Sequence, residues 1–300
     1  SKKGFYNNYE FILKNINSDT QNSSAYKNDG NIYYSSLFQF NSSLPLMKEN
    51  TKHQKIFSPK LSFKIAPDNN TKDISGEKDQ IDVNSLFNLE RISSTIEGGA
   101  SVAYGADYSI FSKKNSLEIF NLKLANSLRF DENSDIPKIN QLGEKTSNFF
   151  GEVTYNPSNI LKTSYKSSIK NNLNVINSES FSTTLSINNF VTTFDYLNEN
   201  NTDSKNSYLQ NETVYNFDSS NSLKFSTRKN KKTDLTEYYN LMYQYKNDCL
   251  AASVEYNKDY YNDNDVKPEE SVFFKLTIIP FGETSSPNLK KWWLKRYIIY

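Results

Sequence analysis

Few residues in this chain could carry out chemistry. Its only histidine, His53, lies in a polar linker with no triad partner or metal-ligand spacing around it. The Gly98-Gly99 pair belongs to neither of the glycine motifs that cradle phosphates. The acidic segment 259–265 could hold a divalent cation only loosely, and we interpret it as a solvated loop. The sequence therefore predicts no enzyme, no metal site and no cofactor.

Cys249 is the only cysteine, and its position is specific. Asn247-Asp248 consists of turn-forming residues, and Cys249 opens the alternating segment that follows. A single thiol cannot form a disulfide within the chain, so it is either paired outside these residues or a small buried hydrophobe. The residues alone leave both interpretations open.

The elements that must position these residues are predicted to be β-strands. The mean hydropathy of −0.73 is low, yet the chain has 21 Tyr and 20 Phe, a combination that suits strands with one apolar and one wet face. Alternating apolar and polar residues recur, and helical periodicity is absent. No apolar run is long enough for a transmembrane helix, and a net charge of +1 gives no reason to expect nucleic acid. About fourteen strands are expected, the earliest over 4–16, 30–42, 56–66, 98–111 and 116–130.

Tight turns and longer loops are predicted to alternate. In an up-and-down antiparallel sheet this places all tight turns at one end, which is typical of outer-membrane barrels with short periplasmic turns and long extracellular loops. The tight turns are expected at 113–115, 156–159, 188–189, 218–221 and 247–248. The longer loops are expected at 67–96, 131–146, 170–178, 199–206, 230–235 and 261–268.

A soluble all-β protein is the main alternative fold. It stays open because Asn121 and Lys123 alternate in phase with Leu117 and Ile119, so that one outward face is expected to be impure. We predict an antiparallel up-and-down transmembrane β-barrel over 1–282, followed by a periplasmic tail over 283–300.

One segment is similar to a known family. Residues 85–99 read SLFNLERISSTIEGG and are followed by AYG at 103–105. Together they resemble a central motif of the LptD family, the outer-membrane lipopolysaccharide-assembly proteins. The stretch 57–63 and segments between 239 and 282 resemble further parts of that family. The motif departs from the family at 94–96, where Ser-Thr-Ile replaces the usual Asp-Arg before Ile or Val, so Arg91 is given no role of its own.

The resemblance implies the C-terminal part of a large barrel, which would be open if the chain is a fragment, with a periplasmic domain expected upstream of Ser1. Lipopolysaccharide would reach the outer leaflet with its sugars in a polar lumen and its lipid part passing through a seam between the first and last strands. The implied partners are this substrate, outer-membrane lipid, a plug lipoprotein of the LptE type and periplasmic bridge proteins bound through the missing domain. The alternatives are an outer-membrane diffusion channel or receptor barrel, or a soluble β-rich adhesin.

The resemblance also implies roles for individual residues. Cys249 is similar to family cysteines that pair with the periplasmic domain. The last strand is expected over about 271–281, where Pro280 lacks an N–H donor and would either weaken the seam or merely end the strand. The long segment 67–96 would fold over or into the barrel mouth. The seam candidates are Phe274, Leu276, Ile278 and Pro280, and the lumen-facing candidates are Lys162, Lys166, Lys224, Arg228, Ser253 and Glu255.

Overall fold

The computed structural model describes residues 4–18, 31–67, 80–92, 97–200, 206–260, 269–278, 282–285 and 289–290. Its elements are strands β1–β17 and two short 3-10 helices, and these residues contain no α-helix. No helix in the described ranges is long and apolar enough to cross a membrane. The strands pair antiparallel, so the fold is all-β, as the alternating sequence predicts.

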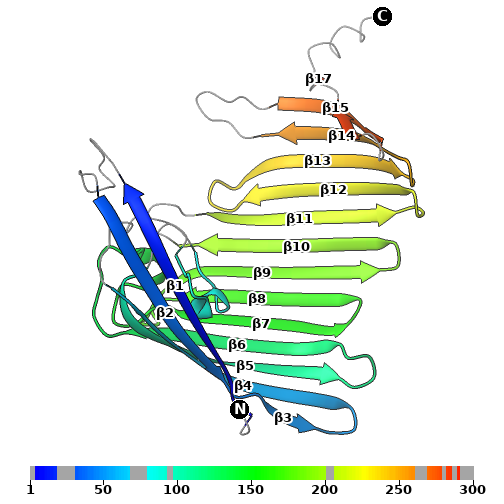
Figure 1. Ribbon diagram of the computed structural model, residues 1–300. Coiled ribbons are helices and arrows are strands. Elements are labelled where there is room, and N and C mark those ends of the chain that lie inside the picture. The colour runs from blue at the N-terminus through cyan, green and yellow to red at the C-terminus, as the bar shows by residue number, and fades with distance from the viewer. Residues whose placement is uncertain are drawn as a thin grey trace, which may run out of the picture. The chain divides into compact units, whose positions relative to one another are not determined.

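Three short strands, β3, β16 and β17, were not anticipated (Figure 1). The others lie close to the predicted segments. The strands are β1 Tyr6–Ser18, β2 Asn31–Ser43, β3 Leu46–Glu49, β4 His53–Ala66, β5 Gly99–Ser112, β6 Glu118–Arg129, β7 Phe149–Ser158, β8 Leu161–Ile169, β9 Ile176–Ile187, β10 Phe190–Glu199, β11 Ser207–Asn216, β12 Asn221–Asn230, β13 Leu235–Lys246, β14 Leu250–Asp259, β15 Glu269–Ile278, β16 Gly282–Ser285 and β17 Leu289–Lys290; the helices are η1 Ser85–Phe87 and η2 Lys138–Asn140.

The chain divides into two compact units. The first contains 1–156 and 164–179, and the second contains 157–163 and 180–300, so β7, β8 and β9 contribute residues to both. In the first unit β1 pairs with β2, β2 and β3 pair with β4, and β4 to β7 follow in chain order. In the second unit β10 to β15 also pair in chain order. Each unit is thus an up-and-down antiparallel sheet.

The register of the first unit sorts alternate residues onto two faces. Phe57, Tyr108, Leu122 and Val153 lie opposite one another in a row across β4 to β7, and they belong to what we call the apolar face. The row Gln39, Lys64, Ser101 and Arg129 crosses β2 to β6 on the opposite, polar face. Large side chains of the apolar face are exposed, as Leu124 shows with an exposed fraction of 54%.

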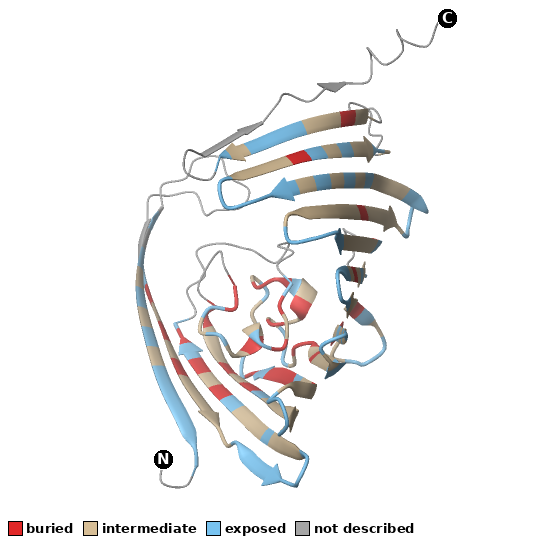
Figure 2. Cartoon of the chain, turned by 90° about the vertical axis from the view of Figure 1, so that its right-hand side faces the viewer, coloured by how far each residue is buried: buried red, intermediate tan, exposed pale blue. Residues whose placement is uncertain are grey.

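The hydrophobic core of the first unit lies on its polar face. The described parts of segments 80–98 and 130–148 fold onto that face and bury apolar side chains against it, and Figure 2 shows buried positions both on these loops and on the strands beneath them. Because the segments supply the apolar surface, the strands need only small or single apolar residues there. The cluster consists of Ile81, Val83, Leu86, Ile92, Ala103, Ala125, Ile136, Leu142 and Phe150.

The second unit has the same two faces, and its described part contains no cluster of buried apolar side chains. Phe225, Leu241, Tyr256 and Val272 form one row across β12 to β15, and neighbouring positions give the row Ser226, Asn240, Asn257 and Ser271. Among its described residues, the buried ones are all small and polar: Thr192, Ser207, Ser226, Ser253 and Ser271. An apolar face this large needs an apolar solvent, because soluble proteins rarely expose such a surface.

Most predicted connections are present. Residues 113–117, 188–189, 217–220 and 247–249 are the short links between successive strands. Two predictions were wrong. Pro157 and Ser158 lie within β7, so the turn is 159–160, and the expected long loop at 230–235 is only the turn 231–234, where Asp234 takes a φ of 53°.

The suspected impurity of the outward face was also wrong. Asn121 and Lys123 lie opposite Ser109 and Asp107 on the polar face, because the register shifts at Ile110/Phe111 and changes the alternation near the start of β6. The lone histidine differs as well. His53 is the half-buried first residue of β4 rather than a residue in a linker.

Candidate functional site

The polar face of the second unit carries paired charges. Lys224 Nζ lies 2.9 Å from a carboxylate oxygen of Glu212 on the neighbouring strand. Arg228 forms an ion pair with Glu237 and lies over the rings of Tyr208 and Tyr238, 5.4 and 5.5 Å from their centroids. All these side chains are partly exposed, so the face remains wet and can offer both charges and hydrogen-bonding groups to a polar ligand.

The strands β12 and β14 place four of the predicted lumen residues on this one face. Lys224 lies opposite Met242, which lies opposite Glu255. Arg228 and Ser253 are an even number of residues from Lys224 and Glu255 on the same strands, so they lie on the same face. Glu255 accepts a hydrogen bond from Asn240, and Ser253 is buried. The shared face follows from the register, whereas its role as a lumen stays a prediction.

The other two candidates lie on β8. Lys166 belongs to the first unit, where its Nζ lies 3.4 Å from Asp82 and 4.0 Å from Glu152. Lys162 lies two alternations earlier on the same strand and is exposed. Glu152 also lies 3.8 Å from Lys123. Lys166 therefore contributes to a cluster of opposite charges that connects segment 80–98 to the strands.

A buried ionic cluster at the start of β5 was missed by the sequence reasoning. Glu97 receives hydrogen bonds from Arg91 Nε at 2.7 Å and from Arg129 at 2.9 Å. The side chains of these three residues have exposed fractions of 5%, 1% and 2%. Arg91 also donates to Ser127 at 3.1 Å and to Ser101 at 2.8 Å. The cluster thus joins segment 80–98 to both β5 and β6.

Charge, rather than solvent, sets the protonation of Glu97. Burial alone would raise its pKa, but the charges of Arg91 and Lys64, the hydrogen bonds from Arg91 and the charge of Arg129 lower the pKa to about 2. The carboxylate therefore remains ionised throughout the physiological range. It is the carboxylate on which the charges of Arg91, Lys64 and Arg129 act.

Backbone carbonyls of segment 80–98 accept hydrogen bonds from further side chains of the polar face. Lys64 donates to the carbonyls of Asn88 and Leu89, the latter at 3.0 Å, and Gln39 donates to the carbonyl of Phe87 at 2.9 Å. The fully buried Leu86, in the short helix η1, packs into the core beside these contacts. The described part of the segment therefore lies against the polar face.

Gly99 is required where the segment enters β5. Its φ is +91°, and a Cβ there would lie 3.2 Å from Arg129 Nη2. Arg129 in turn donates to the carbonyl of Gly98. The family-like motif in segment 85–99 contains Arg91, Glu97 and Gly99, so part of this cluster could be found in the sequence. Its partners Lys64 and Arg129 lie on other strands and could not be identified without the register.

Cys249 lies in the turn between β13 and β14, one residue before β14 begins at Leu250, rather than opening the strand as the sequence predicts. It is an exposed free thiol, so the interpretation as a small buried hydrophobe was wrong. Asn247 shapes the turn, because its Oδ1 accepts hydrogen bonds from the amides of Cys249 at 3.0 Å and Leu250 at 2.8 Å. The thiol is accessible to a partner at the end of the sheet where the links 217–220 and 247–249 lie.

The predicted seam strand corresponds to β15. Phe274, Leu276 and Ile278 lie on the apolar face and are exposed by 52%, 39% and 42%, while Pro280 lies outside the described residues. β15 is not the last strand, because β16 pairs with it over Lys275–Ile278 and β17 pairs over Ser271–Val272. Its second edge is therefore partly occupied by the chain's own C-terminal strands.

These features define a class of protein. Up-and-down antiparallel strands with an exposed aromatic and aliphatic face, a polar face with paired charges and most of the short links at one end of each unit's sheet are those of an outer-membrane β-barrel. A family comparison agrees: the model described as LptD: LPS transport system D matches residues 10–229. The chain belongs to the LptD family and is an outer-membrane protein of lipopolysaccharide transport.

Other comparisons add little. No curated protein matches the chain. Among solved structures, a triple mutant of the Rhodopseudomonas blastica porin is similar at 8% identity and a TM-score of 0.36, covering 95% of this chain and 98% of the porin. A second mutant of that porin has 10% identity with the same coverage and TM-score. Similarity at this level says nothing about function.

Proposed function

We propose that this chain forms part of the route by which lipopolysaccharide is translocated and inserted into the outer leaflet of the outer membrane. The observation that carries this proposal is the division of strands β4 to β7 and β12 to β15 into an apolar and a polar face, in a member of the LptD family. Lipopolysaccharide has the same division, because its sugars require water and its acyl chains require hydrocarbon. The sugars would follow the polar face and the lipid part would leave sideways.

The polar face supplies ligands suited to sugars and phosphates. Lys224 and Arg228 are cations that could exchange their carboxylate partners for phosphate, and Ser253 and Glu255 can hydrogen-bond hydroxyl groups. Lys162 and Lys166 would act in the same way from β8. Because each ion pair is partly exposed, its rearrangement requires little free energy.

The lateral exit is proposed at β15. Phe274, Leu276 and Ile278 would line the seam, and Pro280 would weaken or end it. The short strands β16 and β17 pair with β15 over few residues. Opening there would break far fewer hydrogen bonds than separating two full-length strands. Because β16 and β17 pair with β15, a tail on the periplasmic side is proposed only for the part of 283–300 that follows Lys290.

Cys249 is proposed to form a disulfide with a cysteine of a periplasmic domain. Its exposure and its position among the tight turns support this, since those turns face the oxidising periplasm in this class of protein. Such a bond would close a long loop and fix the docking of the domain. Mass spectrometry of the full-length protein without reduction should detect the linked peptide, and a free thiol at Cys249 would exclude this bridge.

The further partners are proposals of the same kind. A plug lipoprotein of the LptE type would occupy the lumen, and periplasmic bridge proteins would deliver lipopolysaccharide through the upstream domain. Affinity purification of the tagged full-length protein from outer membranes should recover both kinds of partner. Recovery of the chain alone would contradict them.

Depletion of the full-length protein tests the function. Loss of lipopolysaccharide from the cell surface is expected, whereas altered solute uptake with normal surface lipopolysaccharide would indicate a diffusion channel or receptor instead. The route can be tested with a photo-crosslinking residue at Ser253 and, as a control on the opposite face of the same strand, at Val254. Adducts at Ser253 should disappear when cellular energy is depleted, while adducts at Val254 persist. Equal behaviour of the two positions would contradict a route along the polar face.

A further inference from the structure

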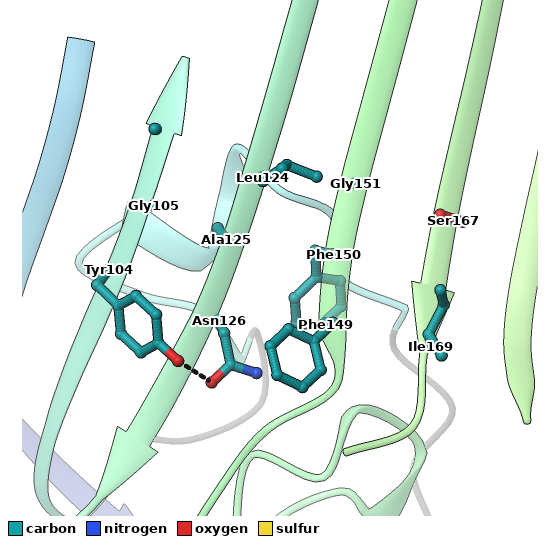
Figure 3. Close-up of a pocket in the computed structure, with 11 residues that line it drawn as sticks. Tyr104, Gly105, Leu124, Ala125, Asn126, Phe149, Phe150, Gly151, Ser167 and Ile169 are labelled. Carbon is teal, nitrogen blue, oxygen red and sulfur yellow. Dashed lines mark hydrogen bonds between the residues drawn. The ribbon is translucent and has the colours of Figure 1, made fainter. Parts of the chain in front are cut away.

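A groove of about 390 Å³ lies on the first unit across β5 to β8. Figure 3 shows its walls, formed by Tyr104, Leu124, Phe149 and Ile169, with Gly151 and Ser167 between them. The register of β5 to β7 places Tyr104, Leu124 and Gly151 at apolar-face positions. The groove therefore opens on the apolar face and is separate from the buried ionic cluster, which lies on the polar face.

The groove exists because small residues occupy its floor. A Cβ built on Gly151 would lie 3.4 Å from Leu124 Cδ2 and 3.5 Å from Ser167 Oγ, so a side chain at this position would project between the walls. Its φ is not in the left-handed region, which means that backbone geometry does not require glycine there. The absence of a side chain at Gly151 leaves space along the sheet surface.

The polar groups at one end of the groove already have partners. Tyr104 donates from its hydroxyl to Asn126 Oδ1 at 3.2 Å, and the Asn126 amide donates to the carbonyls of Ser147 and Asn148 at 2.9 and 3.1 Å. The remaining lining is aliphatic, aromatic or glycine, apart from the Ser167 hydroxyl. A polar head group would find few free partners in the groove, whereas a hydrocarbon chain would fill it.

We infer that this groove binds an acyl chain of lipopolysaccharide. The apolar face of an outer-membrane protein contacts bilayer lipid, so the groove is continuous with a lipid interface. Its residues lie at the start of β7, at the end of β8 and in the middle of β5 and β6, so the groove extends toward the rim where the longer connections β4–β5, β6–β7 and β8–β9 lie. Long loops lie at the extracellular rim in this class, which places the groove in the outer leaflet.

The choice of lipopolysaccharide over phospholipid rests on the proposed function, because insertion into the outer leaflet would bring lipopolysaccharide to this surface. The bound chain would gain packing contacts along the groove walls rather than hydrophobic free energy, since bilayer hydrocarbon is the competing environment. A groove left unfilled would forfeit those contacts. Binding is therefore expected to be specific in position but moderate in strength.

The test uses the full-length protein purified from outer membranes in mild detergent, with retained lipids identified and counted by native mass spectrometry. Gly151→Leu should fill the groove and lower retained lipopolysaccharide about fivefold, which corresponds to about 1 kcal/mol. Ala252→Leu, a matched enlargement on the apolar face of the second unit, should leave retention unchanged. Ser167→Leu provides a second groove-filling variant, and heat-modifiable gel mobility identifies variants that are folded.

Equal retention by the wild type and both folded groove variants would overturn the inference, and so would a groove-dependent lipid identified as phospholipid. Surface lipopolysaccharide is measured in the same strains and after depletion. Normal surface lipopolysaccharide after depletion would contradict the proposed function itself. Loss of surface lipopolysaccharide on depletion together with unchanged retention in Gly151→Leu would contradict only the groove.

Discussion

Replacing Glu97 by Gln should release segment 80–98 from the polar face of the first unit. The substitution keeps the shape of the side chain but removes the carboxylate that pairs with Arg91 and Arg129. Both guanidinium groups are almost fully buried, and Lys64 is a third cation in the same cluster. The variant would therefore leave the two guanidinium groups close together without the carboxylate that pairs with them.

The magnitude follows from the burial of these groups. Breaking a buried ion pair by removing one partner typically costs about 3–5 kcal/mol, because the remaining charge stays desolvated. Glu97 makes two such pairs, and the contacts of Arg91 with Ser101 and Ser127 retain part of the geometry. A loss of about 3–5 kcal/mol in segment docking corresponds to a change of at least a hundredfold in the population of the undocked segment.

Hydrogen–deuterium exchange of the full-length protein in detergent measures this docking directly. Peptides covering 80–92 should exchange much faster in Glu97→Gln, while peptides from β12 to β14 should be unchanged. Glu90→Gln is the matched control, since Glu90 pairs with Lys14 while its side chain remains 41% exposed, and an exposed pair contributes about 0–1 kcal/mol. Equal protection of 80–92 in both variants would refute the argument that the buried cluster holds the segment.

Further predictions concern pH, the two faces and the backbone. The folded pKa of Glu97, about 2, lies below its ordinary value of 4.5, so docking of segment 80–98 should be fully stable above pH 4.5 and weaken as the pH falls toward 2. Hydrogen–deuterium exchange measured against pH should show this trend in the wild type, and the trend should be absent in Glu97→Gln. Leu241→Lys should destabilise the folded protein by about 2–4 kcal/mol if it lies near the bilayer midplane, whereas Asn240→Lys on the polar face should have little effect; urea titrations followed by heat-modifiable mobility would compare them. Gly99→Ala should cost about 1–3 kcal/mol in the same titration because its φ is positive. Lys224→Gln breaks only a partly exposed ion pair and should change stability by less than about 1 kcal/mol, so a large loss would contradict a wet polar face.

The sequence was informative where structure depends on neighbours in the chain. Alternation located the long strands, and turn residues such as Asn188 located several reversals, because both signals are local. It failed where distant strands decide the outcome. The register shift at Ile110/Phe111 reversed the expected face of Asn121, and no local signal could show that Arg91 and Arg129 share one carboxylate. The exposure of Cys249 depends in the same way on where its turn lies.

The polar faces of the two units are covered to different extents, and this difference affects where hydrated sugars can pass. In the first unit the polar face is covered by segments 80–98 and 130–148, which supply both an apolar core and a buried ionic cluster. In the second unit the buried residues of the described polar face are small, and its ion pairs are partly exposed. A face filled by ordered protein cannot also admit hydrated sugars unless its segments move. Sugars are therefore expected to follow the strands β11 to β15 while segment 80–98 stays docked, and Glu97→Gln should change segment protection more than it changes crosslinking at Ser253.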